Sequence, residues 1–161
     1  MRDLSVIQNK KGFICDMDGV VYHGNILLPG VKEFLNWLKS ENKEYLFLTN
    51  ASGRTPKDLK EKLARMGLEV EENHFYTSAQ ATAKFLDAQY PQCTAYVIGD
   101  PGLLNALFEV GVRFDDVNPD YVVVGETSAY NYAVILKAVE LIHKGAKLIA
   151  TNSDLTGPSE Q

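Results

Sequence analysis

The chain has 161 residues, of which 45% are hydrophobic, and its 16 basic and 21 acidic residues give a net charge of −5. That length and hydrophobic content suffice for one core, or for two small units that share an interface. Because the net charge is acidic and no five-residue run is dominated by lysine and arginine, the composition argues against a nucleic-acid-binding surface.

The sequence also argues against a membrane protein. Its beginning contains no hydrophobic region of the signal-peptide type, and no apolar run approaches the roughly 18 residues that a spanning helix needs. We therefore expect a cytoplasmic location. The two cysteines, Cys15 and Cys93, lie far apart and fit no metal-binding or redox spacing. We expect both to be buried, reduced thiols.

In chain order, short apolar runs alternate with longer helical patterns. Strands are predicted at 12–15, 44–49, 95–99, 121–125 and 147–151. Helices are predicted at 31–41, 56–67, 78–90, 102–111 and 131–145, with Ser78 as the cap of the third. This alternation predicts an α/β fold with a parallel sheet. The pattern starts again near residues 90–93, which predicts one unit over residues 1–92 and a second over residues 93–161.

Ligands of open parallel sheets bind at the carboxyl ends of the strands. The residues that follow the predicted strands read "DMDG", "TNASG", "GDPG", "GETS" and "TNSD". Polar loop residues also cap helices, so each stretch taken alone fits a structural role equally well. The first two together are harder to explain in that way, because they place carboxylates, a hydroxyl and an amide at neighbouring strand ends.

Asp16 and Asp18 are the candidate catalytic and metal-binding residues. Two carboxylates one residue apart repel each other unless a cation compensates them. Magnesium prefers oxygen ligands and commonly binds through one or two carboxylates together with substrate phosphate. With its charge screened, Asp16 could attack phosphorus and form an aspartyl-phosphate intermediate. Asp18 could protonate the leaving oxygen and later accept a proton from the hydrolytic water.

Three further residues are candidate phosphate-binding groups. Gly19 would let the backbone turn tightly where a side chain would obstruct the phosphate. Thr49 and Asn50, at the end of the neighbouring strand, could donate hydrogen bonds to the phosphoryl oxygens as charge develops on them.

The segment "DMDGVVYHG" resembles motif I of the haloacid dehalogenase-like phosphatases, and "FLTNASGRTP" resembles their motif II. The order of "FYTSAQATA", "VIGDPGLL", "VNPDYVVVGET", "YNYAVILKAVELI" and "LIATNSD" is similar to the NagD-like, para-nitrophenyl phosphatase branch across nearly the whole chain. The resemblance implies a parallel-sheet core, an inserted α/β cap, a magnesium cofactor and the hydrolysis of small phosphomonoesters such as sugar phosphates or nucleotides.

The motifs of that branch also imply residue roles. Asp16 would be the nucleophile and Asp18 the acid and base, while Thr49 and Asn50 would form the phosphate-binding pair. This sequence departs from the branch at Ala51, where the branch commonly has a second asparagine.

A larger departure lies at the end of the sequence. Members of the branch continue through a Gly-Lys-Pro-like motif and a Gly-Asp motif that completes the magnesium site. Gly99-Asp100 lacks the second carboxylate that the Gly-Asp motif needs, and we interpret Asp100 as a loop or helix-cap residue. We therefore expect the first part of the core and most of the cap, with the second part of the core absent. Asn152 and Asp154 are candidates either to face a bound substrate or to form a turn.

Two alternatives to a phosphatase stay open at this point. One is a catalytically silent fragment that only packs or binds a partner. The other is a phosphorylation-dependent signalling receiver, which needs an upstream acidic pair where residues 1–11 offer only Asp3. In the fold that the resemblance implies, the absence of the second part of the core would leave the strand at 12–15 as an exposed edge. Such an edge favours a homo-oligomer, or pairing with the missing half supplied as a separate chain.

Overall fold

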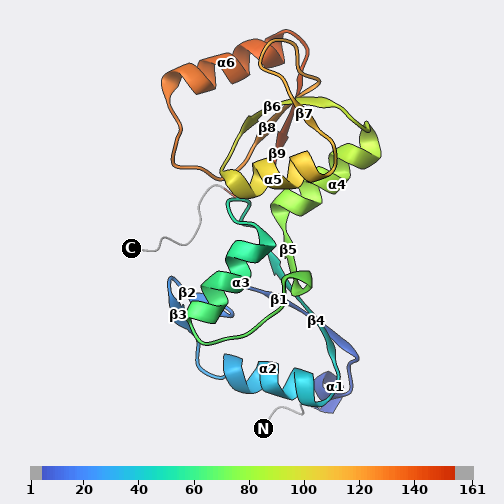
Figure 1. The fold of residues 1–161 in the computed structure, drawn as a ribbon, viewed down its shortest axis with the longest axis vertical. Coiled ribbons are helices and arrows are strands. Elements are labelled where there is room, and N and C mark those ends of the chain that lie inside the picture. The colour runs from blue at the N-terminus through green and yellow to red at the C-terminus, as the bar shows by residue number, and fades with distance from the viewer. Residues whose placement is uncertain (1–4, 155–161) are drawn as a thin grey trace.

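The structure is a computed structural model and describes residues 5–154. Figure 1 shows two α/β units joined through a short central segment, with the first unit at the bottom and the second at the top. The elements, in chain order, are α1 (Ser5–Gln8), β1 (Gly12–Asp16), β2 (Tyr22–His23), β3 (Ile26–Leu27), α2 (Val31–Ser40), β4 (Glu44–Thr49), α3 (Pro56–Arg65), η1 (Glu72–His74), β5 (Phe75–Thr77), α4 (Ser78–Gln89), β6 (Thr94–Ile98), α5 (Pro101–Glu109), β7 (Arg113–Phe114), β8 (Tyr121–Val124), α6 (Tyr132–His143) and β9 (Lys147–Ala150).

The first unit is built on a parallel sheet with the strand order β1-β4-β5. One face of this sheet carries Phe47 and Phe75, which are buried against Leu35 of α2 and Leu63 of α3. The apolar positions of both helices recur with a helical period, and this repetition places them on the face that meets the sheet. A hairpin of β2 and β3, which the sequence analysis did not predict, lies beside this core.

The second unit is a parallel sheet with the strand order β7-β6-β8-β9. Helices α4 and α5 cover one face of it, and α6 covers the other. The predicted α/β fold with parallel sheets is confirmed in both units. The buried residues of α4, among them Ala83 and Leu86, belong to the core of the second sheet. By its packing, α4 therefore belongs to the second unit. The boundary predicted from the sequence, between residues 92 and 93, instead places α4 in the first unit. Where a domain boundary falls stays a prediction.

The beginning of α4 corrects one local prediction. Thr77 rather than Ser78 is the N-cap residue. Its hydroxyl accepts a hydrogen bond of 3.2 Å from the backbone N–H of Gln80, whose side chain accepts one of 3.0 Å from the N–H of Thr77. Thr77 and Gln80 have the three-residue spacing of a capping box, which satisfies two backbone donors at once. Ser78 instead donates a hydrogen bond of 2.7 Å to the carbonyl of Asn50.

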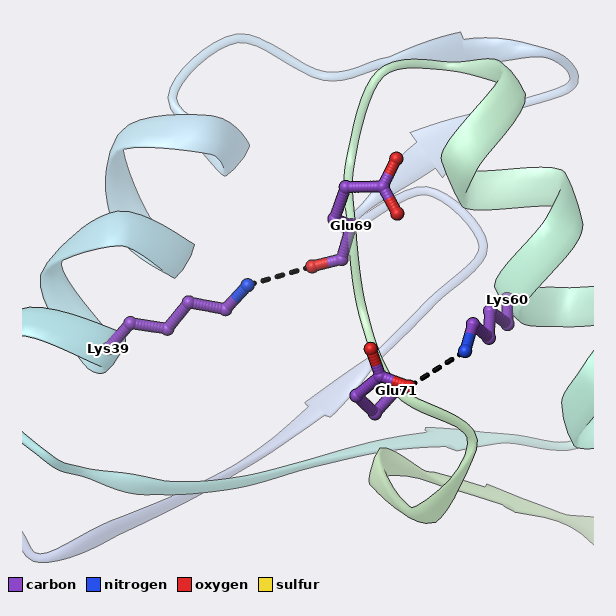
Figure 2. Close-up of polar contacts among 4 residues, drawn as sticks. All are labelled: Lys39, Lys60, Glu69 and Glu71. Atoms are coloured by element: carbon purple, nitrogen blue, oxygen red, sulfur yellow. Dashed lines mark hydrogen bonds and ion pairs between the residues drawn. The ribbon is translucent and has the colours of Figure 1, made fainter.

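The crossover from α3 to β5 is held at two points (Figure 2). Lys39 of α2 donates a hydrogen bond of 2.8 Å to the backbone carbonyl of Glu69. Lys60 of α3 forms an ion pair of 2.7 Å with Glu71. Both contacts are exposed, and an ion pair at the surface contributes little to stability because water and salt screen it. They fix the path of the crossover more than the stability of the unit.

Both cysteines are free thiols. Cys93 is buried as expected, whereas Cys15 on β1 is half-buried. Burial raises the pKa of both thiols, which keeps them protonated and poorly nucleophilic at neutral pH. Across residues 5–154, none of the helices has the length and apolar character that crossing a membrane would require.

Candidate active site

Asp16 and Asp18 lie on the same side of the chain at the carboxyl end of β1. Asp16 is the last residue of the strand, and its side chain is exposed. Met17, between the two aspartates, is fully buried in the core of the first unit. Because side chains alternate along an extended chain, the anchoring of Met17 turns both carboxylates away from the core. The apolar run before them therefore positions two charges at the open end of the sheet.

The turn that follows holds Asp18 in place. The carbonyl of Met17 accepts a hydrogen bond of 2.8 Å from the N–H of Val21, and the N–H of Gly19 donates one of 2.7 Å to the carbonyl of Tyr22. Gly19 has φ +78°, and no atom lies within 4 Å of the position that a Cβ would take there. Its backbone conformation, rather than a close contact, is what favours glycine at this position.

Tyr22 is a site residue that the sequence analysis missed. Its ring is buried, and its hydroxyl donates a hydrogen bond of 3.3 Å to Oδ2 of Asp18. The ammonium group of Lys62, on α3, lies 4.0 Å from the centroid of the same ring. A cation over an aromatic face is attracted by the ring quadrupole. Tyr22 thus connects Asp18 to the packing of α3, and the only local signal for this role is the four-residue spacing from Asp18.

Thr49 and Asn50 lie beside the aspartates, at the end of the neighbouring strand. Asp16 pairs with Leu48 in the parallel register, so Thr49, the last residue of β4, and Asn50, which follows the strand, come directly after that pair. The Thr49 side chain is buried, and its hydroxyl oxygen accepts a hydrogen bond of 3.1 Å from the N–H of Ala51. That contact leaves the hydroxyl hydrogen able to donate. The structure therefore brings the predicted carboxylates and the predicted phosphate-binding pair together at the carboxyl end of one sheet.

Asp154 and Asn152 come to the same end of the first sheet, although they follow the last strand of the second unit. The side-chain amide of Asn50 donates a hydrogen bond of 2.9 Å to Oδ2 of Asp154. The side-chain oxygen of Asn152 accepts one of 3.0 Å from the N–H of Asp154, which is the pattern of an Asx turn. Asn152 thus makes the turn that presents Asp154 to Asn50.

The loop after Asn50 contacts the second unit, a role that its own sequence does not indicate. Ser52 is fully buried, and its hydroxyl accepts a hydrogen bond of 2.9 Å from the N–H of Glu126. The N–H of Gly102, in the first turn of α5, donates one of 3.1 Å to the carbonyl of Gly53. Nothing in the local pattern of "TNASG" indicates a partner that lies 74 residues further along the chain.

Asp100 has the position that we expected, without the expected contact. It is the N-cap residue of α5, but its side chain makes no capping hydrogen bond. Its N–H instead donates one of 3.0 Å to the carbonyl of Glu126. The carboxylates of Asp100 and Glu126 both lie close to Gly53, so the second unit presents acidic groups to the loop that follows Asn50.

The donor set at the end of β1 suits magnesium. Asp16 and Asp18 offer carboxylate oxygens, the ligand type that this hard cation takes from proteins, with water and substrate oxygens completing its shell. Within residues 5–154 no group of three or more histidine, cysteine or acidic side chains is placed to hold a metal ion. From the part of the chain that the structure describes, Asp16 and Asp18 are thus the two carboxylates that could contribute to such a site.

The sequence that carries these two carboxylates, the hydroxyl and the amide matches a known family. Residues 13–113 match the family model described as haloacid dehalogenase-like hydrolase, and the chain belongs to that family. The match covers both aspartates and the Thr49–Asn50 pair. The predicted resemblance to this family is confirmed.

Individual relatives agree with the family model. The chain is 44% identical to dihydroxyacetone phosphatase from Corynebacterium glutamicum (strain R) over 147 residues, which are 91% of this chain and 54% of that protein. Among solved structures, NagD from Escherichia coli K-12 superposes with a TM-score of 0.86 at 42% identity, over 93% of this chain and 60% of that one. These similarities confirm the NagD-like branch.

A third relative was solved with a metal ion. It is glycerol phosphate phosphatase from Mycobacterium tuberculosis in complex with magnesium, with a TM-score of 0.84 at 29% identity, over 92% of this chain and 45% of that one. The chain therefore spans between 45% and 60% of the length of the relatives named here.

Proposed function

We propose that this chain carries the nucleophilic half of a magnesium-dependent phosphatase that hydrolyses small phosphomonoesters. The observation that carries the proposal is the juxtaposition of Asp16 and Asp18 with Thr49 and Asn50 at the carboxyl ends of β1 and β4. The relatives that share this part of the fold are named as phosphatases.

In the proposed reaction, a carboxylate oxygen of Asp16 forms a bond to phosphorus while the bond from phosphorus to the leaving oxygen breaks. Asp18 gives its proton to the leaving oxygen, so the alcohol departs neutral. In the second step Asp18 takes a proton from water, which attacks phosphorus and releases Asp16 and inorganic phosphate. The hydrogen bond from Tyr22 orients the Asp18 carboxylate for both transfers.

Thr49 and Asn50 would bind the phosphoryl oxygens. The Thr49 hydroxyl and the second N–H of the Asn50 amide are donors that can point at charge developing on phosphorus. Asp16 and Asp18 would hold the magnesium ion, Asp18 through the oxygen that does not carry the transferred proton. When bound, the ion would neutralise the negative charge of the Asp16 carboxylate and of the phosphate.

The substrate class that we propose is a small phosphorylated metabolite, such as a sugar phosphate or a nucleotide. The similarity to dihydroxyacetone phosphatase and glycerol phosphate phosphatase supports it. The acidic composition supports the absence of a nucleic-acid partner, and we propose a cytoplasmic location for the same enzyme.

The experiment that tests the proposal is hydrolysis of 4-nitrophenyl phosphate with and without magnesium. We expect turnover that needs the metal, is abolished in Asp16→Asn and is slowed in Asp18→Asn. Asp87→Asn changes an exposed carboxylate on α4 and is the matched control, with unchanged turnover. Asp16→Asn enzyme that retains full activity would refute the proposal. So would inactivity both of the chain alone and of the chain mixed with the rest of E. coli NagD.

One observation favours a second candidate, the catalytically silent fragment. The described residues place no third acidic, histidine or cysteine side chain with Asp16 and Asp18, and a preorganised electrostatic contact that is missing costs on the order of 100-fold or more in rate. We therefore expect the 161-residue chain alone to turn over 4-nitrophenyl phosphate far more slowly than E. coli NagD. Comparable turnover would exclude the silent candidate.

A further inference from the structure

A lysine occupies a core-facing position of α3. The buried residues of this helix are Leu59, Lys62 and Leu63, which have the spacing of one helix face. The two leucines belong to the core of the first unit, and Lys62 is itself only 5% exposed. Such a position is normally filled by an apolar side chain. Departures from that pattern are expected where a residue serves a function.

The packing of α3 does not explain the charge of Lys62. Burying an ammonium group removes its hydration, which is costly unless other contacts compensate for the loss. An apolar side chain of similar volume, such as methionine, would fill the same position without that cost. The amphipathic pattern of α3 thus favours an apolar residue at position 62, and the cation needs another explanation.

The ammonium group of Lys62 lies against a residue of the candidate active site. Figure 1 shows α3 beside the hairpin of β2 and β3. The ammonium group is 4.0 Å from the ring centroid of Tyr22, the first residue of β2. Tyr22 is 3% exposed, and the attraction between a cation and an aromatic face is stronger when both are removed from water. The cation therefore holds one face of the ring in place.

The other end of the Tyr22 side chain reaches Asp18. The hydroxyl of Tyr22 donates a hydrogen bond of 3.3 Å to Oδ2 of Asp18. This distance is longer than the optimum of about 2.7–2.8 Å for a bond between two oxygens. A small displacement of the ring away from Asp18 would therefore break the bond. The position of the ring decides whether the hydroxyl can orient the carboxylate.

We propose that Lys62 is a positioning residue for Asp18: its ammonium group fixes the ring of Tyr22, and the ring aims its hydroxyl at the carboxylate. The inference rests on the proposed phosphatase function, in which Asp18 gives a proton to the leaving oxygen. Lys62 acts through Tyr22 and transfers no proton itself. Without the cation, the Asp18 carboxyl group would be less well placed, and acid catalysis requires the group within hydrogen-bond reach of the oxygen that it protonates.

The test compares two phosphate esters that differ in how much they need an acid. The alkoxide of glycerol 3-phosphate is a strong base and leaves poorly unless it is protonated, whereas 4-nitrophenolate leaves with little protonation. Lys62→Met removes the charge and keeps most of the volume. We expect it to slow turnover of glycerol 3-phosphate about tenfold, and that of 4-nitrophenyl phosphate about twofold or less. Lys57→Met changes an exposed lysine of the same helix and should alter neither rate.

A double-mutant cycle asks whether Lys62 acts through Tyr22. Tyr22→Phe keeps the ring and loses the hydroxyl that donates to Asp18. We expect the Lys62→Met, Tyr22→Phe double variant to hydrolyse glycerol 3-phosphate no more slowly than Tyr22→Phe alone. Multiplied losses, or equal slowing of both esters by Lys62→Met, would overturn the inference and leave the proposed function standing. If Lys62→Met does not fold, Lys62→Gln takes its place.

A spectroscopic measurement decides the same point without turnover. With isotope-labelled tyrosine, the Cζ resonance of Tyr22 is identified by its absence in Tyr22→Phe, and its chemical shift reports the hydrogen bond of the hydroxyl. Asp18→Ala removes the acceptor and should move this resonance in the parent chain. The same change should move it about half as far or less in Lys62→Met. Equal shifts in the two backgrounds would refute the role of Lys62, whereas a parent chain that hydrolyses neither ester would refute the proposed function.

Discussion

The side-chain amide of Asn50 donates a hydrogen bond of 2.9 Å to the carboxylate of Asp154, and this bond joins the end of β4 to the segment that follows the second unit. An amide has two N–H donors. If Asp154 holds one of them, the orientation of Asn50 is fixed and the other is left to a phosphoryl oxygen. We therefore propose that Asp154 positions the side chain of Asn50.

The first prediction separates the hydrogen bond of Asp154 from its charge. Asp154→Asn removes the charge and keeps an acceptor for Asn50, whereas Asp154→Ala removes both. A hydrogen bond contributes about 1 kcal/mol, so we expect inorganic phosphate to bind Asp154→Ala about fivefold more weakly than Asp154→Asn. Calorimetric titration with phosphate measures the difference. Equal affinities in the two variants would show that Asp154 does not position Asn50.

A second prediction concerns the contact between the units. A Cβ added at Gly102 would lie 2.6 Å from the backbone of Arg54, so Gly102→Ala must push the first turn of α5 away from the loop. We expect the free energy of unfolding to fall by about 1–3 kcal/mol. Gly12→Ala is the control, since a Cβ there meets its nearest neighbour, Glu44, at 3.4 Å. Equal stability of the two variants in urea unfolding would be inconsistent with tight packing at Gly102.

The third prediction concerns the beginning of α3. Thr55 and Asp58 form a capping box, with a hydrogen bond of 2.7 Å from the hydroxyl to the carboxylate. Two hydrogen bonds lower the pKa of Asp58 from its ordinary value of 3.8. The bond from the Thr55 hydroxyl has the larger effect, and the bond from the Thr55 backbone N–H has the next largest. Thr55→Ala should reduce the free energy of unfolding by about 1 kcal/mol at neutral pH. Thr55→Ser keeps the hydroxyl and should therefore retain most of the stability that the cap contributes.

The sign of the pH dependence at this cap follows from the lowered pKa. A carboxyl group with a lower pKa in the folded state stabilises the protein above its unfolded-state pKa. The protein loses this stabilisation as the pH falls through the folded-state pKa of the group. The stability difference between the parent and Thr55→Ala should therefore shrink as the pH drops below 3.8. Urea unfolding at several pH values measures it, and a difference that grows on acidification would contradict the assignment.

The sequence was sufficient to predict the site residues that lie at the ends of individual strands. Asp16 and Thr49 each end an apolar run, and parallel strands bring their carboxyl ends to one edge, so the juxtaposition could be predicted from local patterns. The fold class followed from the alternation of the same runs with helices that have one apolar face. The types and spacing of these residues predicted phosphoryl-transfer chemistry, and the family resemblance implied the same roles. The family membership is confirmed.

Other features depend on packing between distant segments, and local patterns do not encode them. Ser52 is buried at a contact with Glu126, whose backbone N–H donates a hydrogen bond to the Ser52 hydroxyl from 74 residues further along the chain. The orientation of α4 toward the second sheet follows from which core buries Ala83 and Leu86, although its own periodicity fits either sheet. The cap at Thr77 was missed because Ser78, the next residue, is an equally good cap former; only the spacing to Gln80 distinguishes them.

The most direct test of Asp16 as the nucleophile is to identify the residue that becomes phosphorylated during turnover. An acyl phosphate on an aspartate is reduced by borohydride to homoserine, which peptide mass spectrometry locates in the sequence. The chain, with the unmatched part of E. coli NagD present, is mixed with magnesium and 4-nitrophenyl phosphate and quenched with borohydride during turnover. We expect homoserine at position 16 in the parent and none in Asp16→Asn. Homoserine at position 18, or turnover with neither aspartate modified, would contradict the assignment of Asp16 as the nucleophile.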